Sequence, residues 1–230
     1  MMDRNVKAVV FDLDGTLLDT EKYYCEGWPA AAAHFGLTLD REKTLMMRSL
    51  GQPFAKQQFA EWFGEDNPFD EVRAYRRVLV DKIFEERGIE LKPGALELLQ
   101  WLKAHGILTA IATANQVERT ERLLRRIGLI EYFDRVIGAD LVERGKPAPD
   151  TYRYACEVLA LPPEQVIAVE DAPNGVLSAH AAGCRVIMVP DQSEPDELLK
   201  EKLFAVVPVL TDIIDLIDSP DGSKAEKGSR

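Results

Sequence analysis

The chain has 230 residues, 46% of them hydrophobic and 29% charged, which is ordinary for one globular domain or for one domain with an insertion. Its 39 Asp and Glu outnumber 28 Lys and Arg, and the resulting net charge of −11 argues against broad binding to nucleic acid or to an anionic membrane. No segment has the roughly 20 consecutive apolar residues that a membrane helix needs, and the N-terminus lacks the apolar stretch of a signal peptide. The three cysteines are few and scattered, so we expect reduced thiols and a cytoplasmic protein.

Short apolar runs of strand length alternate with helical patterns along the chain. These runs are found at 6–11, 107–112, 136–138, 166–169 and 186–189, with a sixth candidate at 205–207. Nearly continuous apolar runs are typical of strands that are buried on both faces of a parallel sheet. Alternation of such strands with helices predicts an α/β fold with a doubly wound parallel sheet.

Proline, glycine and capping residues predict where the helices between these strands begin and end. Pro93 begins a helix that Gly106 ends. The apolar residues expected to face the core from this helix are Leu96, Leu99 and Leu102. Three further helices are predicted at 116–127, 151–160 and 174–183. Asp150 is a candidate N-cap for the second of these three.

Residues 18–91 interrupt the alternation, because they contain no convincing strand. Two stretches in this segment, 23–35 and 68–87, have helical patterns. We interpret 18–91 as a helical domain inserted after the first strand, with the catalytic core formed by residues 1–17 and 92–218. Residues 219–230 are polar and contain Gly and Ser, so we predict a disordered tail.

Two carboxylates, Asp12 and Asp14, follow the first strand directly. In an open parallel sheet, ligands bind at the carboxyl ends of the strands. The two carboxylates can take different tasks, so that one attacks or binds a metal while the other handles a proton. Gly15 allows a sharp turn that brings backbone N–H groups close to an anion.

Two other interpretations of this segment are weaker. Asp-Gly between apolar residues is a signal for a hairpin turn, but the residues after Thr16 have a helical pattern rather than that of a returning strand. A calcium-binding EF-hand loop beginning at Asp12 would need Gly at its sixth position and Glu at its twelfth. Leu17 and Tyr23 stand there instead.

A second pair of acids, Glu170 and Asp171, follows another buried strand. Asp171 could serve as an N-cap for the helix that begins near Asn174, and alone that interpretation would be preferred. With Asp12 and Asp14 at an equivalent strand end, a shared Mg²⁺ site explains all four acids better, because hard oxygen donors suit this ion.

Thr113 and Lys146 are candidates for binding a phosphoryl group. Thr113 ends the second strand, where a hydroxyl and nearby backbone amides can bind phosphate, although an N-cap role is equally consistent. Lys146 lies between Gly145 and two prolines, at 147 and 149, in a short rigid loop. A cation held in this way can neutralise a phosphoryl group beside a metal.

In this combination and order, Asp12-x-Asp14-Gly15-Thr16, Thr113, Lys146 and Glu170-Asp171 resemble the motifs of the haloacid dehalogenase superfamily. The inserted helices resemble the type 1 cap of that family, and residues 11–21 are similar to its β-phosphoglucomutase-like subgroup. The resemblance implies that Asp12 is the nucleophile, that Asp14 is the general acid and base, and that Thr113 and Lys146 hold the phosphoryl oxygens. It also implies that Mg²⁺ binds the Asp12 carboxylate, the Asp14 backbone carbonyl and Asp171, with Glu170 in support.

The substrate site is expected to involve residues around these motifs and on the cap. The expected residues are Leu13, Gly15, Thr16, Asp19, Tyr24, Trp28, Arg48, Ala114 and Asn115. For three of them another role competes: Trp28 as part of the cap core, Arg48 in a surface ion pair and Asn115 as a helix N-cap.

The resemblance predicts a phosphatase that acts on a small phosphate ester, such as a sugar phosphate, as a monomer. β-Phosphoglucomutases carry a His on the first cap helix, whereas Tyr24 occupies the corresponding place and no His precedes His34. Hydrolysis is therefore favoured over mutase activity. Receiver domains, a non-enzymatic alternative, also have a phosphorylatable Asp, a Thr and a Lys. They lack the large insert and place the Asp after a later strand.

Overall fold

A six-stranded parallel sheet in the order β3-β2-β1-β4-β5-β6 forms the centre of the computed structural model, which describes residues 5–218. Its strands are β1 (Ala8–Phe11), β2 (Leu108–Ala112), β3 (Arg135–Ile137), β4 (Val166–Glu170), β5 (Arg185–Met188) and β6 (Ala205–Val206). All neighbouring strands are parallel, so the predicted fold class is confirmed. The order of strands reverses between β1 and β4, which lie side by side in the middle of the sheet.

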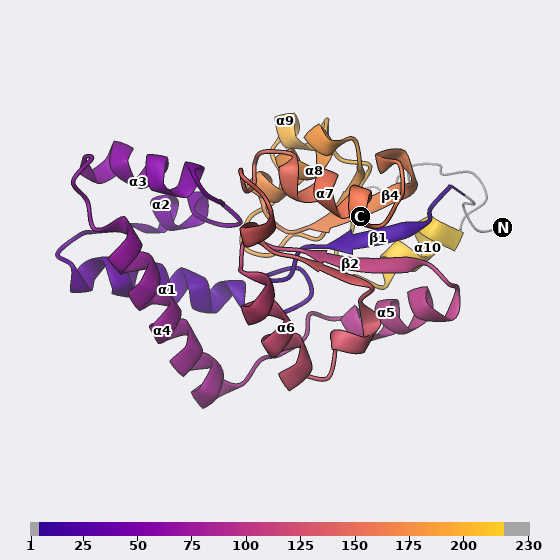
Figure 1. The fold of residues 1–230 in the computed structure, drawn as a ribbon, viewed down its shortest axis with the longest axis horizontal. Coiled ribbons are helices and arrows are strands. Elements are labelled where there is room, and N and C mark those ends of the chain that lie inside the picture. The colour runs from indigo at the N-terminus through magenta and orange to yellow at the C-terminus, as the bar shows by residue number, and fades with distance from the viewer. Residues whose placement is uncertain (1–4, 219–230) are drawn as a thin grey trace, which may run out of the picture.

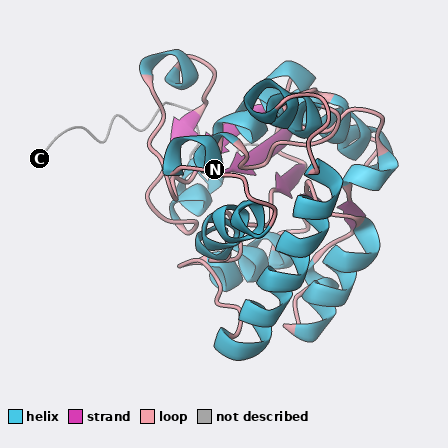
Figure 2. Ribbon diagram, turned by 90° about the vertical axis from the view of Figure 1, so that its left-hand side faces the viewer, coloured by secondary structure: helices cyan, strands magenta, loops and turns pink. Residues whose placement is uncertain are grey.

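Helices cover both faces of this sheet (Figures 1 and 2). One face packs against α5 (Ala95–Ala104), α6 (Val117–Arg126) and α10 (Asp212–Asp218), and the other against α7 (Asp150–Val158), α8 (Pro173–Ala182) and α9 (Glu197–Lys200). Along β1, Val9 and Phe11 join the first hydrophobic cluster, while Ala8 and Val10 join the second. This alternation explains why the strands are apolar at every position. Three short 3-10 helices are η1 (Ile130–Tyr132), η2 (Ala139–Leu141) and η3 (Pro163–Gln165).

The prediction for the buried face of α5 was wrong at one residue. Leu99 and Leu102 are fully buried, but Leu96 is 38% exposed. The helix begins at Ala95, and its buried residues Ala95, Leu98, Leu99 and Leu102 follow the i, i+3, i+4, i+7 spacing of one helix face. Leu96 lies outside that stripe.

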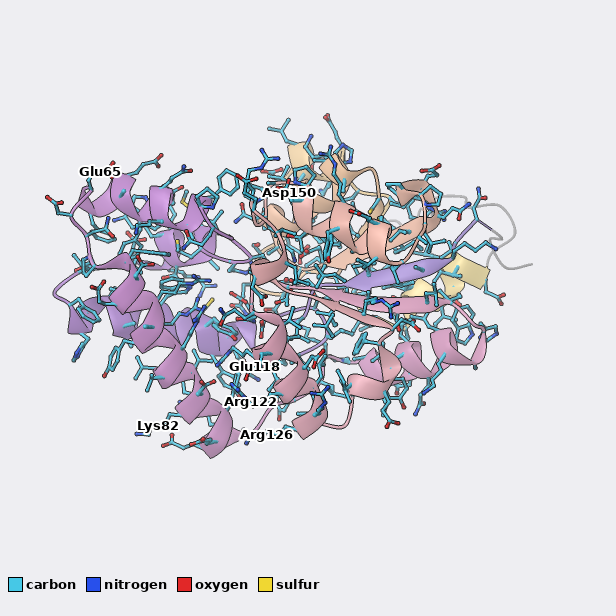
Figure 3. All side chains as sticks on the ribbon, viewed as in Figure 1. Glu65, Lys82, Glu118, Arg122, Arg126 and Asp150 are labelled. Carbon is cyan, nitrogen blue, oxygen red and sulfur yellow. The ribbon has the colours of Figure 1, made fainter. Side chains whose placement is uncertain are left out.

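The prediction that Asp150 caps the following helix was also wrong. α7 begins at Asp150 itself, after Pro149, and the carboxylate forms no capping hydrogen bond. It pairs instead with Arg144, whose Nε and Nη2 lie 3.1 and 2.9 Å from the two carboxylate oxygens. Asp150 is labelled at the edge of the core in Figure 3.

Four of the five helices between β1 and β2 form a separate group beside the sheet (Figure 1): α1 (Glu21–His34), α2 (Arg41–Met46), α3 (Phe54–Phe63) and α4 (Phe69–Arg87). Trp28, Phe59 and Phe69 lie in a hydrophobic cluster of their own, separate from the two clusters on the sheet. The two connections to the core pair through a bridge between Leu18 and Leu91. We propose this pairing as the boundary of a cap domain over residues 18–91. The tail predicted at 219–230 lies outside the described residues.

No helix within residues 5–218 is long and apolar enough to cross a membrane. The three cysteines form no disulfide, although the sulfur atoms of Cys156 and Cys184 lie 3.7 Å apart in the core.

Candidate active site

Three of the four acids singled out by the sequence meet where the strand order reverses. β1 pairs with β4 so that Phe11 lies opposite Val169, which places Asp12 beside Glu170 at the carboxyl ends of the two strands. Asp12, Glu170 and Asp171 are almost completely buried. Crevices at such a switch point are the usual ligand sites of open α/β sheets.

Lys146 connects the two strand ends. Its Nζ donates to Asp12 Oδ1 at 2.5 Å and to Glu170 Oε1 at 2.6 Å, and it is only 1% exposed. The phenol of Tyr152 on α7 also donates to Glu170 Oε1, at 2.6 Å. A buried lysine is stable in its charged form only beside such carboxylates. Lys146 is therefore a fixed cation next to Asp12.

Burial and neighbouring charges shift the protonation of these groups in opposite directions. Burial raises the pKa of Glu170 to about 8 and that of Asp171 to about 6, although nearby cations oppose the shift. Burial also raises the pKa of Asp12, against the effect of Lys146. For Lys146, burial lowers the pKa, but Asp12 and Glu170 more than offset this and hold it above its ordinary value. The acids would therefore gain from a further positive charge.

Asp14 points away from this group. Its two oxygens accept hydrogen bonds from Thr20 Oγ1 at 2.6 Å and from Asn115 Nδ2 at 2.7 Å. Burial raises the pKa of Asp14, against the hydrogen bond from Thr20, and so favours the protonated form. Two carboxylates separated by a single residue thus occupy different environments, which suits a nucleophile and a general acid.

Two glycines allow the acids to pack this closely. Gly15 has φ +85°, and a Cβ there would lie 2.5 Å from Asp171 Oδ2. A Cβ on Gly175, at the start of α8, would overlap the Glu170 carboxylate. Neither position can carry a side chain unless an acid moves.

The donor atoms at this site fit a hard divalent cation. Carboxylate oxygens of Asp12, Glu170 and Asp171 lie within 4.8 Å of one another, and all three residues are buried. Glu170 Oε2 has no hydrogen-bond partner among the described residues. Oxygen donors without sulfur or imidazole match the preference of Mg²⁺.

Arg48 brings a cation from the cap to the same site. Its guanidinium forms an ion pair with the Asp171 carboxylate and lies 3.8 Å from Glu21 Oε1. It also donates to Ser193 Oγ at 2.9 Å and to the Asp171 carbonyl at 3.1 Å. Arg48 is only 3% exposed, so the ion pair considered from the sequence exists but is buried rather than at the surface.

The cap segment around Arg48 is hydrogen-bonded to the core. Asn174 at the start of α8 donates to the Arg48 carbonyl at 2.9 Å. Gly51 N donates to the Lys146 carbonyl at 2.8 Å, and Gly145 N donates to the Gln52 carbonyl at 2.6 Å. The cap therefore contacts the loop that carries Lys146.

A cavity between the cap and the strand ends contains many of the residues predicted from the sequence. The predicted residues that line it are Asp12, Asp14, Tyr24, Trp28, Arg48, Thr113, Ala114 and Asn115. Thr113 does not cap a helix, since α6 begins only at Val117 after Gln116; its Oγ1 accepts from Asn115 N at 3.1 Å. Trp28 belongs both to this lining and to the cap core.

Other predicted residues lie below or away from this cavity. Leu13 is fully buried in the core, and Thr16 donates to Asp171 Oδ1 at 3.4 Å. Asp19 pairs with Lys22 at 2.5 Å, and its backbone N–H donates to the Glu90 carbonyl, so it belongs to the connection between the domains. Lys146, Glu170 and Asp171 lie beneath the cavity rather than along it.

Several cavity residues were not predicted from the sequence. They are Glu21, Met47, Ser49, Leu50, Ala55, Phe69, Arg73 and Arg76. Arg73 and Arg76 stand three residues apart within the helical pattern of 68–87, so they share a helix face. The spacing can be read from the sequence, but the sequence does not show that this face of the helix lines the cavity.

Comparisons with known proteins agree with this architecture. The profile of the haloacid dehalogenase-like hydrolases matches residues 6–183. A phosphorylated carbohydrates phosphatase from Thermotoga maritima is 31% identical over 208 residues, covering 88% of this chain and 94% of that protein. Hexitol phosphatase A from Escherichia coli is 34% identical over 185 residues, covering 80% and 82%.

A crystal structure of a CbbY variant from Rhodobacter sphaeroides, in complex with xylulose-(1,5)bisphosphate, has a TM-score of 0.77 and 27% identity. It covers 93% of this chain and 100% of the CbbY chain.

Fold and site together define a hydrolase with a parallel-sheet α/β core and a helical cap inserted after the first strand. A crystal structure of a putative β-phosphoglucomutase from Thermotoga maritima is 27% identical with a TM-score of 0.68, covering 92% of this chain and 100% of that one. The chain belongs to the haloacid dehalogenase-like hydrolases, in their β-phosphoglucomutase-like, helically capped branch.

Proposed function

We propose that the protein hydrolyses the phosphomonoester of a small metabolite, such as a sugar phosphate, through an aspartyl-phosphate on Asp12. The family and the phosphatases among its relatives support the class of reaction. The observation that carries the proposal is the placement of Asp12, with a buried cation on one side and the separately held Asp14 close by.

In the first step, an Asp12 oxygen attacks phosphorus and the bond to the leaving oxygen breaks. Protonated Asp14 gives its proton to that oxygen, a role that its raised pKa favours. In the second step, Asp14 takes a proton from water as this water attacks phosphorus, which frees Asp12 and releases phosphate. Lys146 and Thr113 would stabilise the negative charge on the phosphoryl oxygens.

The residues that would hold Mg²⁺ are Asp12, Asp171 and Glu170, together with the backbone carbonyl of Asp14. Bound there, the ion would neutralise phosphoryl charge during transfer. The positive charges of Mg²⁺ and Lys146 are needed because a phosphate dianion must approach several carboxylates.

Hydrolysis is preferred to mutase activity because of Tyr24. Burial raises the pKa of its phenol, so this side chain remains protonated and does not act as a proton carrier near neutral pH. A mutase must also protect its aspartyl-phosphate from water until the phosphoryl group is transferred to a sugar phosphate.

The test is a panel of sugar phosphates and p-nitrophenyl phosphate, with and without Mg²⁺, on the full chain and on Asp12→Asn. We expect Mg²⁺-dependent release of phosphate that the substitution abolishes. With β-glucose 1-phosphate and a bisphosphate primer, glucose 6-phosphate formed faster than free phosphate would favour the mutase. Absence of Mg²⁺-dependent turnover across the panel would favour a binding module.

A further inference from the structure

Helix α4 of the cap presents two arginines to the active-site cavity. Arg73 and Arg76 line it together with Asp14, Thr113 and Asn115 from the core. Both arginines are partly buried. They lie on the cap side of the cavity, whereas the expected nucleophile and its lysine lie on the core side.

These arginines differ from the other arginines near the site, which have carboxylate partners. Arg48 pairs with Asp171, and Arg119 pairs with both oxygens of Asp81 at 2.8 and 2.5 Å. Among the residues that the structure describes, none forms an ion pair with Arg73 or Arg76, and the buried Nε of Arg76 has no hydrogen-bond partner.

Aromatic rings hold Arg76 in place. Its guanidinium carbon lies 4.3 Å from the centre of the Trp28 ring and 5.1 Å from that of Tyr24. Trp28 and Tyr24 are one helical turn apart on α1, so they form a single platform. Stacking restricts the guanidinium and leaves its edge free for hydrogen bonds.

Keeping two such cations without a carboxylate partner is unfavourable in the free protein. Burial lowers the pKa of Arg76 to about 10, and burial followed by repulsion from Arg77 lowers the pKa of Arg73. Asp70 acts on Arg73 only from a distance and is itself 2.8 Å from Lys56. Glu21 and Asp14, which line the same cavity, act on Arg76 through space without forming an ion pair with it. Cations held without a direct partner are expected where a ligand supplies one.

We propose that Arg73 and Arg76 form a second anion site, so that the preferred substrate carries an additional phosphate or carboxylate on its leaving group. This inference rests on the proposed function, because the transferred phosphoryl group occupies the core side of the cavity. The second anion then lies on the cap side, where the guanidinium groups can bind it through paired hydrogen bonds. A sugar phosphate whose leaving group is uncharged would leave both arginines without an anionic partner.

The experiment compares substrates that differ only in a second anion. Glycerol 3-phosphate is matched with 3-phosphoglycerate for a carboxylate, and fructose 6-phosphate with fructose 1,6-bisphosphate for a phosphate. We expect the doubly anionic member of at least one pair to have a kcat/KM roughly 10- to 100-fold higher. The pair with the larger ratio identifies the anion.

In Arg73→Gln and Arg76→Gln we expect that ratio to fall about tenfold, mainly through KM, because a charge-assisted contact to the leaving group is lost. Arg87→Gln, on the same helix but in an exposed pair with Glu26, should leave the ratio unchanged. Preference of the unmodified protein for the singly anionic members would overturn the proposal. Equal losses on both members of a pair would assign the arginines to the reaction or to the fold instead.

A binding measurement separates this proposal from the proposed function. Calorimetric titration of Asp12→Asn with 3-phosphoglycerate and glycerol 3-phosphate, and with the two fructose phosphates, requires no turnover. Tighter binding of a doubly anionic member, lost in Asp12→Asn/Arg76→Gln, would support the anion site even if no hydrolysis were found. Equal binding within both pairs would refute it even in an active phosphatase.

Discussion

On the core side of the active site each carboxylate has a partner, whereas two cations on the cap side have none among the described residues. Asp12 and Glu170 share Lys146, and Asp14 accepts from Thr20 and Asn115. On α4, Arg73 and Arg76 line the same cavity, and no residue within 5–218 forms an ion pair with either of them.

This difference separates two tasks. The core positions groups that act on phosphate itself, and these can have partners in the absence of substrate because every substrate presents the same phosphoryl group. The cap meets the part of the substrate that varies. Charges there find their partner only in the correct molecule, which makes them a source of specificity.

The largest effect is expected from the nucleophile. Asp12→Asn should lower kcat by roughly 10⁴-fold or more, because no other side chain can form the phosphorylated intermediate. Steady-state release of phosphate measures this. Asp150→Asn, which removes a carboxylate paired with Arg144 at the edge of the core, should leave kcat unchanged. A comparable loss of kcat in Asp12→Asn and Asp150→Asn would mean that the assay reports loss of folded protein rather than loss of the nucleophile.

A somewhat smaller loss is expected at Asp14. Asp14→Asn should lower kcat by about 10²- to 10⁴-fold, since the amide neither gives nor accepts the proton. Its Mg²⁺ affinity, measured by calorimetry, should stay within a few-fold of the unmodified protein, because the expected ligand is the backbone carbonyl. Asp171→Asn is the matched variant and should lose Mg²⁺ binding. Equal losses of affinity would contradict this division between the two acids.

Arg48 tests the balance on the core side. Arg48→Met leaves Asp171 and Glu21 buried without their cation, and removal of one partner from a buried pair costs about 3–5 kcal/mol. Urea unfolding of the metal-free protein should show most of this loss. Saturating Mg²⁺ should restore part of it, because the ion supplies the missing charge.

The control for Arg48 is Arg87→Met, which breaks an exposed ion pair with Glu26 and should cost no more than about 1 kcal/mol. If both variants lose the same small amount, or if Mg²⁺ stabilises them equally, Arg48 does not balance the charge of Asp171.

Gly175 tests how tightly the core side is packed. In Gly175→Ala the new methyl group would overlap the Glu170 carboxylate, and overpacking of this kind costs about 1–3 kcal/mol. Urea unfolding measures the loss. Shortening the acid in Gly175→Ala/Glu170→Asp should recover part of it, whereas simple addition of the two single effects would show that the residues do not interact.

The core side could be predicted from the sequence because its residues stand at fixed places relative to strands. A parallel sheet brings the residues after β1 and β4 together, so Asp12 and Glu170 meet although they are far apart in the chain. The cap side could not be predicted in the same way. Arg48 meets Asp171, 123 positions away, only because of how the cap rests on the core. The orientation of Arg76 depends on that contact too.

The smallest effect concerns the support of Glu170. Tyr152→Phe removes a hydrogen bond of 2.6 Å to a buried carboxylate and should destabilise the protein by about 1–2 kcal/mol. It should also weaken Mg²⁺ binding about tenfold, because groups that orient metal ligands commonly contribute that much. Tyr154→Phe, on the same helix, is the matched control and should change neither quantity. If the two variants behave alike, the phenol of Tyr152 does not position Glu170, and Lys146 alone holds that carboxylate on the core side.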